Sequence, residues 1–138
     1  ISNALLCGKD GFIITEEGFL LSDHSWFGNN TNEIKTIPRL KPKGKKITGK
    51  VLSLASDFAV QGYGHFAIDS LARLKLFYDA GYKLDDVDYI FCPKPTPGNA
   101  EVLFTKLGIP RDKCIWADNN KGIRPETLIA CSSPARKA

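Results

Sequence analysis

The alternation of apolar and polar residues is clearest between positions 65 and 80, where it predicts an α-helix. Apolar side chains recur there at steps of three and four residues, which places them on one helical face: Phe66, Ile68, Leu71, Ala72, Leu74, Phe77 and Tyr78. Gly81 follows at the position where helices commonly end in a residue of positive φ. The pattern therefore predicts one long helix that ends before Gly81.

Short apolar runs on both sides of this helix predict strands. Four such runs follow one another along the chain, at residues 50–55, 87–92, 114–117 and 127–131. A second helix is expected over residues 99–107, where Asn99 can cap its start and Gly108 follows its end. Strands that alternate with helices of this length favour a parallel sheet with helices on both faces. The predicted fold class is α/β, with a Rossmann-like parallel sheet flanked by helices.

The N-terminal third has a different pattern, which predicts a β-hairpin followed by irregular chain. The runs 12–15 and 19–22 are rich in Phe, Ile and Leu, and Glu16-Glu17-Gly18 forms a turn-prone link between them. Residues 23–46 show no sustained periodicity and are expected to form a surface connection. The chain is thus divided into a hairpin and loop region (1–34), a basic connection (35–50) and a Rossmann-like core (51–138) within one domain of 1–138.

The length and composition agree with a single domain that buries one core, because 43% of the 138 residues are apolar and 25% are charged. The net charge of +4 is concentrated in one stretch without acidic residues: Lys35, Arg39, Lys41, Lys43, Lys45, Lys46 and Lys50. A solvated loop explains this stretch, and so does contact with a nucleotide diphosphate, an anionic glycan or, peripherally, an acidic membrane surface. Nucleic acid is disfavoured, because no aromatic residues are interleaved with the lysines.

The four cysteines, Cys7, Cys92, Cys114 and Cys131, lack the paired spacing of a zinc site and are expected to be free thiols. Free thiols favour a reducing compartment, which predicts a cytoplasmic protein. Asn29-Asn30-Thr31 forms a glycosylation sequon that would matter only in a secretory lumen. The Asp-x-Asp triplet at residues 86–88 precedes a strand, opposite the edge where ligands gather, and is expected to be a solvated turn. No metal is therefore predicted.

Candidate chemistry lies where the strand at 50–55 leads into the long helix. His65, Asp69 and Arg73 are spaced by four residues and share one helical face. Either His65 or Asp69 can act as a general base, and a carboxylate can also hold the imidazole in one tautomer. The structural alternative is that Asp69 stabilises the helix start and pairs with Arg73, while His65 contacts a neighbouring loop.

Three further positions at this edge carry two interpretations each. Gly62-Tyr63-Gly64 resembles the opening of a phosphate-binding turn, or supplies two flexible residues to a loop. Tyr63 and Phe66 can stack on a sugar ring or pack in the core. Lys94, after the strand at 87–92, can meet an anion or belong to a rigid Pro-rich connection.

The segment 61–74, QGYGHFAIDSLARL, resembles the family 61 glycosyltransferases, the capsular polysaccharide biosynthesis type. Their N-terminal half carries an aromatic-His-aromatic, Asp, Leu-x-Arg-Leu helix. Similar surroundings occur at Gly8-Lys9-Asp10-Gly11, Leu107-Gly108-Ile109 and Arg124-Pro125-Glu126-Thr127-Leu128. The bulky aromatic pair that usually precedes the helix is reduced here to Tyr63-Gly64, and no late Gly-rich donor segment is present.

The resemblance implies one lobe of a two-lobed, inverting glycosyltransferase that is part of a longer enzyme. Asp69 would be the preferred base, with His65 beside it, and substrate contacts are expected from Tyr63, Gly64, Arg73 and Lys94. A nucleotide-sugar would be the co-substrate, without another cofactor, and a C-terminal lobe would bind most of it. The acceptor would be a glycan or a glycoconjugate such as a protein. The resemblance is compatible with a cytoplasmic, membrane-associated enzyme in bacteria or an ER/Golgi lumenal one in eukaryotes. The alternative is a non-catalytic glycan- or nucleotide-binding domain.

Overall fold

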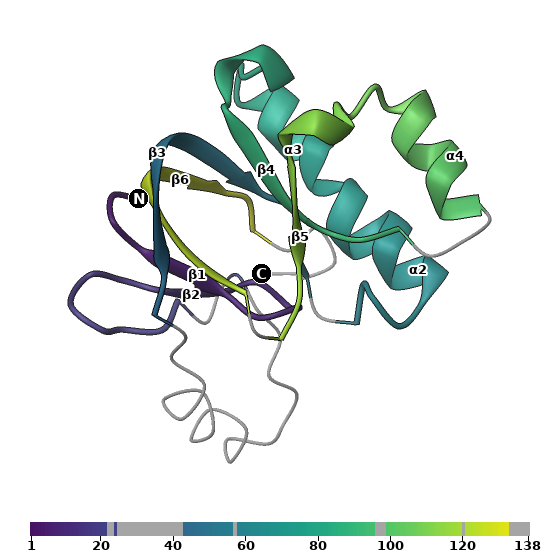
Figure 1. Cartoon of the computed structure of the whole chain (residues 1–138). Helices are drawn as coiled ribbons and strands as arrows, with labels where there is room; N and C mark the ends of the chain where they lie inside the picture. Colours follow the sequence, from purple (N-terminus) through teal and green to yellow (C-terminus); the bar gives the residue numbers. More distant parts are fainter. Residues whose placement is uncertain (22–23, 25–42, 57, 96–98, 120, 133–138) are drawn as a thin grey trace.

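The computed structural model describes residues 1–21, 24, 43–56, 58–95, 99–119 and 121–132 (Figure 1). Asn29, Lys35, Arg39 and Lys41 lie outside the described residues. Among those residues, six strands form one sheet in the order β2-β1-β6-β3-β4-β5. Their bounds are β1 Leu5–Cys7, β2 Phe12–Ile14, β3 Lys45–Ser53, β4 Tyr89–Pro93, β5 Cys114–Ala117 and β6 Gly122–Ala130.

The sheet is mixed, with its parallel part in the order expected of a doubly wound fold. β6, β3, β4 and β5 run parallel, whereas β1 pairs antiparallel with both β2 and β6. Numbered from β3, the order β5-β4-β3-β6 is the 3-2-1-4 arrangement of a Rossmann half. The predicted α/β class is confirmed at this level, with an antiparallel addition at one side of the parallel strands.

The predicted long helix is present, but its centre is a π-helix. It comprises α2 (Tyr63–His65), a π segment (Phe66–Leu71) and α3 (Arg73–Asp79). The Ala72 N–H donates to the Ala67 carbonyl at 3.2 Å, the wide i to i−5 spacing of such a turn. Gly81 ends the helix with φ +88°, as its position predicted.

The second helix and two short 3-10 turns complete the described elements. α4 spans Asn99–Lys106, and the 3-10 turns are Leu84–Asp86 and Arg111–Lys113. After α4 the Ile109 N–H donates to the Phe104 carbonyl at 3.1 Å, and both side chains are buried in the same cluster. This is the hydrogen bond and apolar contact of a Schellman motif, so the predicted helix end at Gly108 is confirmed.

The N-terminal hairpin that the sequence pattern predicted is extended by one earlier strand, β1. β1 and β2 pair through the turn at residues 8–11, and Gly11 has φ +72°. The predicted pairing of the 12–15 and 19–22 runs is present as a bridge between Ile14 and Leu20. The Thr15 N–H donates to the Phe19 carbonyl at 2.8 Å, and the Leu21 N–H donates to the Ile13 carbonyl at 2.9 Å. β1 was missed because three apolar residues without alternation carry little signal.

The two faces of the sheet are covered in different ways, which corrects the prediction of helices on both faces. In the described part of the chain the helices pack on one face, where side chains of α3 and α4 meet those of β3 and β4 (Figure 1). On the other face, the buried cluster joins the hairpin to the parallel strands: Ala4, Leu6, Ile13, Val51, Ala55, Phe91, Ala117, Ile123 and Leu128. A Cβ at Gly11 would lie 2.5 Å from the Cβ of Ala55, so the hairpin turn lies against the end of β3.

Residues 45–50 of the predicted basic connection are part of the sheet. β3 begins at Lys45, so residues 45–50 are not a connection, and they pair with β6 from Ile123 onward. A bulge at Gly49, with φ +99°, interrupts this ladder. The Gly49 N–H donates to Glu126 Oε2 at 2.8 Å, and the Lys50 N–H donates to Asp88 Oδ2 at 2.7 Å. The lysine-rich sequence forms a strand because β6 supplies hydrogen-bond partners that local pattern does not reveal.

Candidate functional site at the carboxyl end of β3

Two buried polar side chains of the long helix hold the chain that follows β3. Ser70 Oγ donates to the Leu54 carbonyl at 2.5 Å, and Arg73 Nη1 donates to the Ala55 carbonyl at 2.8 Å. Ser70 is fully buried and Arg73 is 2% exposed. Buried carbonyls without partners cost stability, so these two bonds fix the exit of β3 against the helix.

Arg73 therefore has a different place from the one predicted. Its Nε also donates to the main-chain oxygen of Asp69 at 3.0 Å, and its Nη2 donates to the His24 carbonyl at 3.2 Å. The guanidinium binds backbone oxygens in the interior, which differs from the predicted substrate contact. These three hydrogen bonds also differ from the alternative prediction, in which Arg73 pairs with the carboxylate of Asp69. Spacing places a residue on a helical face but does not reveal what covers that face.

His65 and Asp69 are in direct contact, as their spacing predicted. His65 Nδ1 and Asp69 Oδ2 are 2.6 Å apart, and the side chains are 54% and 20% exposed. An ionised carboxylate only accepts hydrogen bonds, so this contact matches the His65 tautomer with its proton on Nδ1, in which Nε2 of a neutral ring is an acceptor. The Phe58 ring lies 5.5 Å from the imidazole, centroid to centroid. The pair can thus present a basic nitrogen whose tautomer is set by a carboxylate.

The other residues predicted to contact substrate are Tyr63, Gly64 and Lys94, and Phe66 was a candidate for stacking on a sugar. Tyr63 is 51% exposed at the start of α2, and an added Cβ at Gly64 would meet no atom within 4 Å. Lys94 is exposed directly after β4, which runs parallel to β3, so both strands end at one edge of the sheet. Phe66 is buried and stacks on Phe104 at 5.8 Å, so its core interpretation is confirmed and sugar stacking by Phe66 is wrong.

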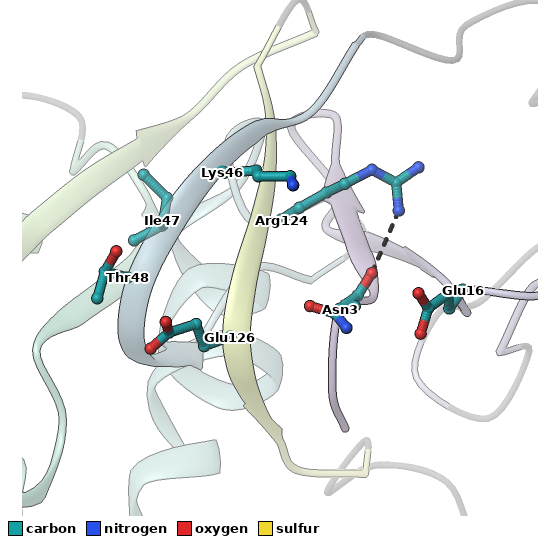
Figure 2. Close-up of a pocket in the computed structure, with 7 residues that line it drawn as sticks. All are labelled: Asn3, Glu16, Lys46, Ile47, Thr48, Arg124 and Glu126. Carbon is teal, nitrogen blue, oxygen red and sulfur yellow. Dashed lines mark hydrogen bonds between the residues drawn. The ribbon is translucent and has the colours of Figure 1, made fainter.

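Two clefts in the described part of the chain are lined by residues other than His65 and Asp69. One is a groove of about 470 Å³ between the long helix and α4, lined by Leu71, Leu74, Tyr78, Leu103 and Leu107 among others. The other, of about 560 Å³, contains Lys46 and Arg124 (Figure 2). The sequence pattern drew attention to Lys46 through the basic stretch. It gave no reason to single out Arg124, which reaches Lys46 only through strand pairing.

The cysteines are free in the structure, and two of them interact across neighbouring strands. A hydrogen bond with Cys114 and burial raise the pKa of the Cys92 thiol, while the same hydrogen bond lowers the pKa of Cys114. Burial raises the pKa of Cys7 to about 11. Buried thiols with raised pKa values are unreactive, so Cys7 and Cys92 act as small apolar side chains.

Comparisons with known proteins add no support to the motif resemblance at residues 61–74. No protein-family model, no curated protein and no solved structure matches the chain. Within the described residues, no helix has the length and apolar character needed to cross a bilayer. What can be said about function therefore rests on the residues and on their geometry.

Proposed function

We propose that this domain is a glycosyltransferase lobe that transfers a sugar, with inversion, from a nucleotide-sugar donor to a glycan or protein acceptor. The observation that carries the proposal is the 2.6 Å contact between His65 Nδ1 and Asp69 Oδ2 in the helical segment after β3. Two features support it. In open α/β sheets, ligands bind beyond the carboxyl ends of the strands, and π-helical turns are frequent at functional sites.

The geometry favours His65 over Asp69 as the base, whereas the family resemblance favoured Asp69. The imidazole is more exposed than the carboxylate, and Oδ2 of Asp69 already accepts from Nδ1. In an inverting transfer, the acceptor oxygen attacks the anomeric carbon and the bond from that carbon to the diphosphate oxygen breaks. The proton of the acceptor hydroxyl would pass to His65 Nε2, and Asp69 would stabilise the imidazolium that forms.

The remaining residues would bind and orient the substrates. Tyr63 presents an exposed ring on which a sugar can stack, and Lys94 presents an ammonium to the departing diphosphate. Gly64 leaves room beside Tyr63, since nothing would contact a side chain there. A second lobe would supply most contacts to the nucleotide. Arg73 has a supporting role in this scheme, because it positions the loop after β3 and not the substrate.

A second candidate function is non-catalytic binding of a glycan or nucleotide at the same edge. The observation in its favour is the exposed ring of Tyr63, which lies at the start of α2 and needs no catalytic partner to bind a sugar. In that case the imidazole–carboxylate pair would order the helix start, and the exposed Tyr63 would provide the contact surface.

The test compares acceptor-dependent diphosphate release from uridine- and guanosine-diphosphate sugars by the intact protein and its variants. His65→Gln is expected to lower the rate by about 10²–10⁴-fold, the usual contribution of general base catalysis. Asp69→Asn is expected to lower it less, because the base remains but loses its orienting carboxylate. Asp79→Asn is the matched control, since Asp79 also forms an i to i+4 pair, with Lys75, on the same helix.

The alternatives give different results in this experiment. Equal rates for His65→Gln, Asp79→Asn and the unaltered protein would refute the assignment of the base. Nucleotide or glycan binding without diphosphate release by any of them would favour the non-catalytic domain. A larger loss for Asp69→Asn than for His65→Gln would restore Asp69 as the base.

A further inference from the structure

We propose that the cleft on the N-terminal halves of β3 and β6 binds an acidic sugar, with its carboxylate held between Lys46 and Arg124. The inference does not depend on glycosyl transfer, because none of the residues assigned to that reaction lines this cleft. The two cations are register partners on adjacent parallel strands, so their side chains leave the sheet next to each other (Figure 2).

Two facing cations on adjacent strands form a favourable place for a ligand carboxylate. Facing cations on neighbouring strands repel each other, and among the described residues no carboxylate forms an ion pair with either of them. A carboxylate placed between the ammonium and the guanidinium would relieve the repulsion and accept charge-assisted hydrogen bonds.

Arg124 is held in position before any ligand binds. Its Nη1 donates to the Asn3 carbonyl at 3.2 Å, and Asn3 adopts a left-handed backbone with φ +52°. A Cβ at Gly44 would lie 2.7 Å from Cγ of Arg124, so the stem of the arginine packs directly on the backbone there. The guanidinium keeps further N–H donors for a ligand. Such preorganisation lowers the entropy lost on binding.

The rest of the cleft favours a ligand with several hydroxyl groups over a simple anion. Hydrogen-bond acceptors come from three separate segments: Asn3, Glu16 and Glu126. Glu126 is oriented by the Gly49 N–H, and Thr48 adds a hydroxyl beside it. The two carboxylates would repel an anion of either kind, but only a sugar has several hydroxyl groups that can donate to them. The volume of about 560 Å³ lies within the range of small-ligand sites.

The experiment follows backbone amide shifts of the intact protein during titration with sodium glucuronate, glucose, sodium phosphate and glycine. Glucuronate is expected to shift the amides of Gly44 and Gly49, and glucose is expected to leave them unchanged because it lacks the carboxylate. Lys46→Gln should weaken glucuronate binding about tenfold, which is the loss expected for one hydrogen bond to a charged group. Arg124→Lys should weaken it similarly, because it keeps the charge but loses the planar fork.

Lys45→Gln is the matched control, since Lys45 precedes Lys46 on the same strand and projects to the opposite side. Its affinity for glucuronate is expected to be unchanged. Phosphate binding as tightly as glucuronate would show that hydroxyl groups contribute nothing and would overturn the acidic-sugar assignment. Tighter binding of glycine, or no shift with any probe, would overturn it as well. None of these outcomes affects the diphosphate-release test of His65.

Discussion

Replacement of Gly49 by alanine tests the bulge that shapes the Lys46–Arg124 cleft. Gly49 has φ +99°, where an L side chain is strained, and its added Cβ would overlap the carboxylate of Asp88. That carboxylate accepts from the Lys50 N–H at 2.7 Å, so relief of the overlap would break this bond. Backbone strain of about 1–2 kcal/mol and a lost exposed hydrogen bond of about 1 kcal/mol predict a total of about 2–3 kcal/mol.

Gly18→Ala separates the two contributions, because Gly18 has φ +93° but no atom within 4 Å of an added Cβ. It is expected to cost only the strain, about 1–2 kcal/mol. The free energy of unfolding is measured by urea denaturation, followed by circular dichroism, for each variant and the unaltered protein. Equal losses for Gly49→Ala and Gly18→Ala would refute the argument from the Asp88 overlap. Added Asp88→Ala should cost nothing further in the Gly49→Ala background, where the bond to Lys50 is already lost, but about 1 kcal/mol in the Gly18→Ala background.

Two further predictions concern the buried polar groups. Ser70→Ala should lower the free energy of unfolding by about 1–3 kcal/mol, because the buried Leu54 carbonyl loses its donor. Thr105→Ala removes an exposed side-chain bond to a carbonyl and should change this free energy by less than about 0.5 kcal/mol, so similar losses in urea titrations of the two variants would contradict the prediction. A thiol reagent at pH 8 should modify Cys114 first, since the raised pKa of about 11 leaves about one in a thousand Cys7 thiols ionised. Cys7 labelling should rise as the pH approaches 11, and Cys92 should react only on unfolding; mass spectrometry that finds Cys7 modified as fast as Cys114 would exclude the proposed burial.

Elements with a strong local period could be predicted from the sequence with their ends. The helix that stops before Gly81 and the helix that stops before Gly108 are both present, because apolar spacing and a left-handed glycine act within one or two turns. The π segment inside the first helix could not be predicted in this way. It is where Ser70 meets the end of β3, a contact between residues 16 positions apart.

The candidate site was only partly accessible to the same reasoning. The contact of His65 with Asp69 follows from four-residue spacing on one helical segment, and the structure contains it. Arg73 has the same spacing from Asp69, yet it is buried, because carbonyls from residues 24 and 55 surround its guanidinium. The environment of a side chain depends on segments that are remote in sequence.

Periodicity and glycine placement sufficed to establish an α/β chain with two helices and four of its strands. The antiparallel pairing of β1, the entry of the lysine-rich residues 45–50 into β3, and the meeting of Lys46 with Arg124 depended on the folded chain. The physical reason is that helical hydrogen bonds and caps close within a few residues, whereas a strand is stable only when another strand supplies its partners. For β3 that partner is β6, whose residues pair with positions 77 or 78 residues earlier in the sequence, such as Ile123 with Lys45 and Ala130 with Ser53.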